Sequence, residues 1–437
     1  MSEIVPLLVC LNELLTPTTT RQLCQIVFAL LCSPDRITML GLSRWPERGG
    51  SYRTIQRFYQ RPMNWAQVHW ALIQTHLLGS SGPYLLAGDE VVVSKAGKQT
   101  HGVGRFYSGL AQRVIPGISF LAVSLIDVEK RQSYPLQIEQ LLPHQAPDKP
   151  ATPPEKRPPG RPKGRKNYEK PPPQLTPELT SLQGMLRDSL ARITRLQVKH
   201  IVLDGKFGNY PATWTVRETG LHIISKMRRD AALYLPHTGD KPRRGPTPRY
   251  GDKLDYKHLP ADARVATRTE GDYHIDTYQF HLYHKDYPDL LNVVVIVKTH
   301  LKTGKRGHVV LFSTDTDLTA EQIVDYYSLR FQIEFNFRDA KQHWGLEDFM
   351  NVRQQAVTNA ANLAFFMVNF SAALRQSEPT AHLSVLDLKA RFRAHRYLSE
   401  TIKLLPDPPD EVLISRIWRR LTRFSAIHPK QSDRSVA

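Results

Sequence analysis

The alternation of apolar and polar residues changes its period along the chain. Residues 1–80 carry apolar side chains at intervals of three and four, which is the period of amphipathic helices. From Leu85 to Val93 the apolar run is nearly continuous, as in a buried strand, and runs at 105–110 and 116–127 predict further strands. These patterns predict a helical N-terminal part followed by the antiparallel start of a sheet.

The later part of the chain repeats this change of period. Residues 176–197 predict a helix, and the segments Lys199–Gly205 and Leu221–Met227 predict buried strands. The alternating segment Tyr273–His284 lies among basic turns and predicts an inserted β-rich subdomain. From Thr319 onward the period is again that of helices.

A chain of 437 residues is long enough for two or three domains. Eleven prolines between residues 143 and 173 indicate a linker inside the sheet-forming part. We expect six segments: an N-terminal helical domain at 1–80, the first part of the core at 81–228, the basic proline-rich linker at 143–173, a β-rich insertion at 229–315, the last part of the core at 316–380 and a C-terminal helical region at 381–437.

Composition indicates a folded protein with a polyanionic partner. The chain has 59 Lys and Arg against 41 Asp and Glu, a formal net charge of +18. A basic excess of this size favours nucleic acid, because each neutralised phosphate releases counterions. The hydrophobic content of 41% excludes a basic disordered tail.

Cysteine usage and apolar segments indicate the compartment. Cys10, Cys24 and Cys32 lack C-x-x-C spacing, so they predict buried free thiols in a reducing, cytosolic setting. The run Leu23–Cys32 is too short to span a bilayer, and asparagines interrupt Ala356–Leu374. We therefore expect two core helices, no membrane partner and a cytoplasmic protein.

A basic helix is predicted near the N-terminus. Ser51 is a suitable N-cap for a helix from Tyr52 to Arg61, in which Arg53, Arg57 and Arg61 lie four residues apart on one face. This layout suits a DNA-recognition helix that faces phosphates. A solvated amphipathic helix would show the same pattern.

Two other basic segments allow more than one interpretation. In the linker, the Gly-Arg-Pro sequence at Arg161 resembles an AT-hook, whose arginines enter the minor groove of A·T-rich DNA, although a generic basic tether has the same composition. After the first strand, Lys95, Lys98, His101 and Arg105 either line a DNA channel or belong to a solvated hairpin.

Two aspartates stand where apolar strands would bury them. Asp89 shares a strand face with Val91, and its neighbour Glu90 points to the other face. Asp204 stands where an apolar strand ends. A carboxylate in such a place must be paired, bind a metal or lie at the open end of the sheet. Alone, each also fits a strand-end aspartate that caps a turn.

A third carboxylate lies in a more specific pattern. Tyr327, Arg330, Glu334 and Lys341 are spaced so that on one continuous helix they share an arc of about 60°. Such a face presents a carboxylate that can hold a divalent cation, with two cations and a phenol that can bind phosphate oxygens. We expect Leu329, Phe331 and Phe335 to anchor the opposite face; a surface helix with intrahelical ion pairs is the alternative.

The pattern Tyr327-x2-Arg330-x3-Glu334-x6-Lys341 is similar to the signature of DDE transposases encoded by bacterial insertion sequences, in the group with a β-rich insertion before the third acid. The segment around Asp89 resembles the first-acid strand of that family. The segment Leu203–Gly208 resembles its second-acid turn. The resemblance covers roughly residues 20–425.

The resemblance implies a ribonuclease-H-like mixed sheet flanked by helices, with Asp89, Asp204 and Glu334 as the catalytic and metal-binding triad. It implies that two Mg²⁺ or Mn²⁺ ions activate first water and then a DNA 3′-hydroxyl. Tyr327, Arg330 and Lys341 are implied contacts to DNA-end phosphates. The implied partners are the inverted-repeat ends and target DNA, with a homodimer in the synaptic complex and a location at the bacterial nucleoid.

The sequence departs from that family at one point. Relatives that excise through a DNA hairpin use an indole in or beside the β insertion, yet no tryptophan lies between residues 215 and 343. The sequence leaves the hairpin step open, because Tyr234, Tyr250 or Tyr278 could stack the flipped base instead, or the fold could bring in Trp214 or Trp344. Two rivals to cut-and-paste transposition remain: a transposase-derived protein that only binds DNA, and a metal-dependent nuclease of the same fold.

Overall fold

The structure is a computed structural model, and it describes residues 3–425 except 35, 48, 80–81, 110, 144–171, 241–246, 377–379 and 408. Arg161 and most of the predicted linker lie outside the described residues. The structure opens with five α-helices: α1 (Ile4–Leu8), α2 (Pro17–Cys32), α3 (Met39–Leu42), α4 (Tyr52–Gln60) and α5 (Trp65–His76). The predicted N-cap of α4 is confirmed, because the Ser51 hydroxyl accepts a hydrogen bond from the Thr54 N–H at 3.4 Å.

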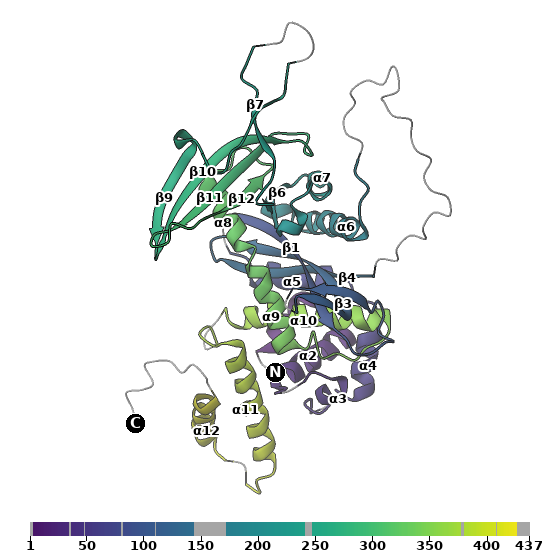
Figure 1. Cartoon of the computed structure of the whole chain (residues 1–437). Helices are drawn as coiled ribbons and strands as arrows, with labels where there is room; N and C mark the ends of the chain where they lie inside the picture. The colour runs from purple at the N-terminus through teal and green to yellow at the C-terminus, as the bar shows by residue number, and fades with distance from the viewer. Residues whose placement is uncertain are drawn as a thin grey trace, which may run out of the picture.

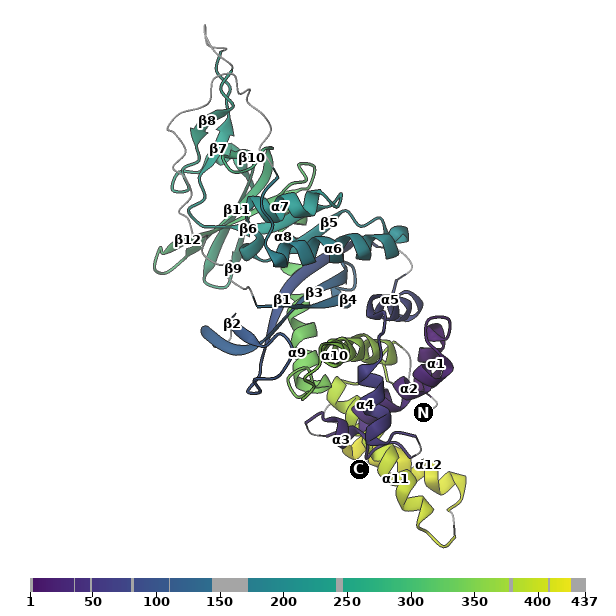
Figure 2. The ribbon, with the colours of Figure 1, turned by 90° about the vertical axis from the view of Figure 1, so that its right-hand side faces the viewer.

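The central sheet is mixed. Its strands are β1 (Tyr84–Ser94), β2 (Gly104–Ser108), β3 (Arg113–Asp127), β4 (Gln132–Leu141), β5 (His200–Leu203) and β6 (His222–Met227). β1, β3 and β4 pair antiparallel, whereas β1, β5 and β6 pair in parallel. Helices α6 (Pro177–Arg192) and α7 (Tyr210–Arg217) lie on one face of this sheet (Figure 2).

The β-rich insertion continues the same sheet. It consists of β7 (Leu233–Pro236), β8 (Tyr250–Lys253), β9 (Arg264–Glu270), β10 (Tyr273–His284), β11 (Leu291–His300) and β12 (Arg306–Ser313). Strand β12 pairs antiparallel with β6, so the described strands form one twelve-stranded sheet. Figure 1 shows the insertion at one end of the molecule and the C-terminal helices at the other.

Five helices complete the described chain: α8 (Ala320–Leu329), α9 (Gln332–Trp344), α10 (Gln354–Leu374), α11 (Val385–Lys403) and α12 (Glu411–Ser425). By length and composition α10 is long and apolar enough to cross a membrane, but 89% of its most apolar stretch is buried inside the fold. It is a core helix, as the sequence predicted.

Three buried asparagines explain why polar residues interrupt α10. The Asn359 amide donates to the carbonyls of Tyr59 and Arg61 at 2.7 and 2.8 Å, and its oxygen accepts from the Trp65 indole at 2.8 Å. Asn369 donates to Pro135 in β4 at 2.8 Å, and Asn362 donates to Ile138 in the same strand at 3.4 Å. These side chains join α10 to the N-terminal helices and to the sheet.

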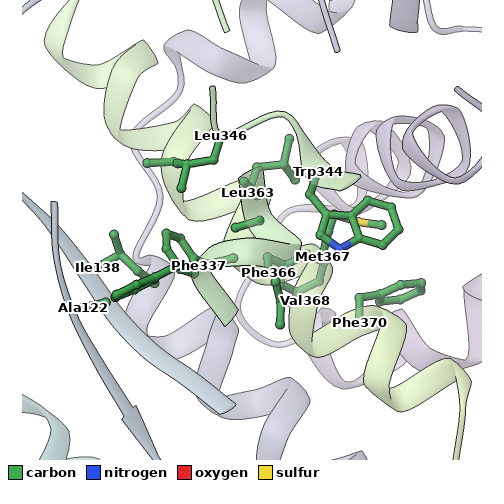
Figure 3. Packing of buried hydrophobic residues seen from close by; sticks show 14 of the residues in the cluster. Ala122, Ile138, Phe337, Trp344, Leu346, Leu363, Phe366, Met367, Val368 and Phe370 are labelled. Atoms are coloured by element: carbon green, nitrogen blue, oxygen red, sulfur yellow. The ribbon is translucent and has the colours of Figure 1, made fainter. Parts of the chain in front are cut away.

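The core lies on both faces of the sheet. On one face Ala87 and Val91 of β1 pack with the N-terminal helices, α9 and α10; on the other, Leu86 packs with α6 and α7. Figure 3 shows Phe337 of α9 lying between the sheet residues Ala122 and Ile138 and the helix α10. The predicted ribonuclease-H-like α/β fold class is confirmed.

Candidate active site

Strand pairing places the first two acids side by side. The parallel pairing of β1 with β5 runs to the partners Gly88 and Leu203; the next residues are Asp89 in β1 and Asp204 directly after β5. The strands approach closely here, because a Cβ on Gly88 would lie 2.8 Å from the Leu203 side chain. The two carboxylates thus emerge at the same level of the sheet, where β5 ends.

Asp89 is largely buried, and both of its carboxylate oxygens have partners. One accepts the backbone N–H of Glu90 at 2.8 Å, and the other accepts the Arg330 guanidinium at 3.0 Å. Burial raises the pKa of Asp89 to about 6, and the charges of Asp204 and Glu334 act in the same direction; the hydrogen bond from Glu90 and the charge of Arg330 oppose the shift. The main cause is burial, and the smaller contributions of Asp204 and Glu334 place their charges near Asp89.

Asp204 begins a tight turn after β5. Its carboxylate accepts the Gly205 N–H at 2.5 Å, and its backbone carbonyl accepts the buried Ser225 hydroxyl at 2.9 Å. Four residues on, a Cβ at Gly208 would lie 2.2 Å from the carbonyl oxygen of Lys226. The turn is therefore fixed to β6 at both ends.

Arg330 joins the first acid to the third. One guanidinium nitrogen binds Asp89, and the other binds Glu334 at 2.8 Å. Only 15% of the Arg330 side chain and 19% of the Asp89 side chain are exposed, so this ion pair is shielded from water; Glu334 is 38% exposed. The structure thus brings Asp89, Arg330 and Glu334 into one network.

The expectation of one continuous helix from Tyr327 to Lys341 is wrong. α8 ends at Leu329 and α9 begins at Gln332. Across the junction the N–H groups of residues 330, 331, 333 and 334 bind carbonyls three residues earlier, at 3.1–3.2 Å, so the backbone is tightened as in a 3₁₀ turn. Neither glycine nor proline marks this break in the sequence.

Tyr327 and Lys341 consequently lie on different helices. Burial raises the pKa of the half-buried Tyr327 hydroxyl, with further contributions from the charges of Asp204 and Asp89, so it lies near the acids. Lys341 donates to the Val92 carbonyl at 2.9 Å and pairs with Glu347 at 3.1 Å. Lys341 therefore lies farther along β1 than the acids.

The predicted apolar anchor is only partly correct. Leu329 is fully buried, but Phe331 is 50% exposed and Phe335 is 37% exposed. The two rings form an edge-to-face pair with centroids 5.4 Å apart, and the Arg338 guanidinium lies 4.8 Å from the Phe335 ring centroid. The break between α8 and α9 turns these rings toward solvent beside Glu334.

The basic hairpin after β1 divides into held and exposed side chains. Lys95 donates to the carbonyls of Glu347 and Phe349 at 3.1 and 2.9 Å, and burial lowers its pKa to about 8. Lys98 and Arg105 are exposed, and His101 is half-buried.

The predicted recognition helix is likewise divided. On α4, Arg53 and Arg57 are exposed, whereas Ile55 and Phe58 are buried on the other side. Arg61 follows the helix and donates to the Thr19 hydroxyl of α2.

An ion-pair cluster on the opposite face of β1 was not predicted from the sequence. Lys206 pairs with Glu90 at 2.6 Å and with Glu178 of α6 at 2.7 Å. The strand alternation that turns Glu90 away from Asp89, and the place of Lys206 two residues after Asp204, are the signals that would have indicated it.

The donor set fits a hard divalent cation in its chemistry. Asp89, Asp204 and Glu334 offer carboxylate oxygens, which Mg²⁺ and Mn²⁺ prefer. Among the described residues no group of three His, Cys, Asp or Glu side chains is close enough to hold an ion. Arg330 lies between Asp89 and Glu334 and supplies the positive charge there, so a three-carboxylate set requires this guanidinium to release one of them.

Comparison with known proteins agrees with this geometry. No curated protein matches the chain. A family model described as DDE superfamily endonuclease matches residues 9–286, which is more than half of the chain and includes Asp89 and Asp204. The chain therefore belongs to the DDE superfamily endonuclease family.

Proposed function

We propose that this protein is a transposase that cuts the ends of an insertion sequence and joins them to target DNA. The observation that carries the proposal is the paired emergence of Asp89 and Asp204 at the end of β5, with Arg330 connecting Asp89 to Glu334. Membership of this family implies that the substrate is DNA, and such endonucleases generally use divalent metal ions.

In this proposal Asp89, Asp204 and Glu334 hold two Mg²⁺ or Mn²⁺ ions. When bound, such ions lower the pKa of an attacking water or 3′-hydroxyl and neutralise the charge that develops on the leaving oxygen. Arg330 compensates the acids before DNA arrives and then turns to a phosphate. Tyr327 supplies a hydroxyl donor beside the acids, and Lys341 binds the DNA end farther along β1.

The proposed DNA path continues beyond the acids. Arg53, Arg57, Lys98 and Arg105 are exposed and free to move toward phosphates. Arg61 and Lys95 are engaged within the protein and would contact DNA only after leaving those partners. Two copies would hold the two ends together in a synaptic complex at the nucleoid of a bacterial cytoplasm.

The test uses duplex DNA that carries the ends of the encoding element. Asp89→Asn, Asp204→Asn and Glu334→Gln should each reduce Mg²⁺-dependent cleavage by more than about a hundredfold, while DNA binding persists. Loss of a residue that only supports a metal ligand reduces activity by up to about a hundredfold, and loss of a ligand itself should cost more. The matched control, Asp188→Asn on the exposed side of α6, should cleave like the wild type.

The same element-end DNA and protein variants distinguish the rival functions. A transposase joins pre-cut 3′-hydroxyl ends to target DNA, whereas a nuclease of this fold cleaves without joining. Binding without cleavage by the wild-type protein would identify a DNA-binding derivative. A triad variant that cleaves at the wild-type rate would remove that residue from the proposed site.

A further inference from the structure

The ion-pair cluster behind the acids links three elements of the core. Lys206 stands in the turn after β5, Glu90 in β1 and Glu178 in the first turn of α6. The ammonium nitrogen of Lys206 lies 2.6 Å from one Glu90 oxygen and 2.7 Å from a Glu178 oxygen. The other Glu90 oxygen accepts the hydroxyl of the buried Ser119 at 2.5 Å. All three charged groups are therefore fixed in position.

The cluster is adjacent to both strand acids. Glu90 follows Asp89 directly on β1, and Lys206 is two residues beyond Asp204. Because successive strand residues point to opposite faces, the cluster lies on the α6 side while Asp89 faces Arg330. A shift of either acid thus requires a shift of the cluster.

Backbone pairing does not fix the distance between these acids by itself. The β1–β5 pairing has three residue pairs and ends at Gly88 and Leu203, one residue before each acid. Beyond that point β1 continues and the chain after β5 turns away. Among the described contacts, the Lys206 bridge to Glu90 is the side-chain ion pair that ties the Asp204 turn back to β1.

We propose that Lys206 is a positioning residue that, through Glu90 and Glu178, fixes the spacing between Asp89 and Asp204 and thereby sets the affinity of the site for divalent cations. The inference rests on the proposed function, because it assigns the two aspartates to metal. If the ion pairs of Lys206 served stability alone, their removal would leave the cation affinity of the folded protein unchanged.

The test is a Mn²⁺ titration of the full-length protein without DNA, in which electron paramagnetic resonance measures free Mn²⁺. Lys206→Met should weaken binding about tenfold or more, as loss of an outer-shell partner does, and Lys206→Arg should restore most of the affinity because it keeps the charge and donors. The control is Lys199→Met, which removes an exposed lysine just before β5.

Two further variants separate the possible failures. Asp204→Asn should lose Mn²⁺ binding; wild-type affinity in that variant would overturn the proposed function itself. If Asp204→Asn behaves as expected but Lys206→Met binds like the wild type, the positioning role is wrong and the proposed function stands. If circular dichroism shows that Lys206→Met does not fold, Glu90→Gln provides the same test from the other side of the bridge.

Discussion

Asp89 shows how one buried carboxyl couples folding to function. A strand among valines places it out of water, and the neighbouring acids add repulsion, so the protein holds its ionised form at a cost. Arg330 offsets part of that cost with a hydrogen bond at 3.0 Å. A divalent cation would offset more of it, which is why the same environment that disfavours the bare carboxylate favours metal binding.

Because of this cost, we expect the free energy of unfolding to differ between the wild type and Asp89→Asn by an amount that depends on pH. Burial raises the pKa of Asp89 from 3.8 to about 6, so between these values the folded protein keeps a proton that the unfolded chain has released. Stability of the wild type therefore falls as pH rises through this window, whereas the neutral amide contributes no such loss.

The variant should gain about 2–3 kcal/mol in unfolding free energy relative to the wild type between pH 4 and pH 7. Urea unfolding with a chelator present, so that no cation compensates the charge, measures the difference at each pH. A difference that is constant over this range would show that the Asp89 carboxyl is not buried as described.

At the scale of elements, the sequence predicted the helices and strands that follow from the local period of apolar residues. It missed the features that depend on contacts with distant residues. The apolar runs of β1, β3 and β5 and the capped helix α4 stand close to their expected positions. Strand β4 was missed because Pro135 and several polar residues disguise it; the proline lies at an irregularity in its pairing with β3.

The break between α8 and α9 was missed for a different reason. Tyr327, Arg330, Glu334 and Lys341 were predicted from the sequence as one set, but their angular positions assumed an uninterrupted α-helix. The 3₁₀-type junction is associated with an inward-pointing Arg330 that binds Asp89, a residue 241 positions earlier in the chain. A helical period contains no information about such a partner.

The asparagines of α10 allow a prediction about how elements are joined. Asn359→Ala would leave the Trp65 indole and the carbonyls of Tyr59 and Arg61 without their partner in a buried site. Each unsatisfied group costs about 1–3 kcal/mol, so we expect a loss of about 3 kcal/mol or more in urea unfolding. Asn362→Ala, which removes one longer bond to β4 and one bond within the helix, should cost less. Equal losses would contradict a special role for Asn359.

At the scale of the whole molecule, the net charge of +18 is not all available to DNA. Arg330, Lys341 and Lys206 are paired with the protein's own acids. Arg330 and Lys341, which were placed beside the acids from the sequence, are thus held internally until a substrate replaces their partners. Long-range attraction of DNA must then come from exposed residues such as Arg53 and Arg57.

The salt dependence of DNA binding tests this division. Each phosphate contact contributes about 0.9 to the slope of log K against log salt concentration, so the double variant Arg53→Ala/Arg57→Ala should lower the magnitude of the slope by about 2. Fluorescence anisotropy with a short DNA duplex, repeated over a range of salt concentrations, measures it. Arg187→Ala/Arg195→Ala removes two exposed arginines at and after α6 and serves as the matched control for net charge. If both double variants lower the slope equally, the effect is one of total charge, and α4 is a solvated helix instead of a DNA-binding one.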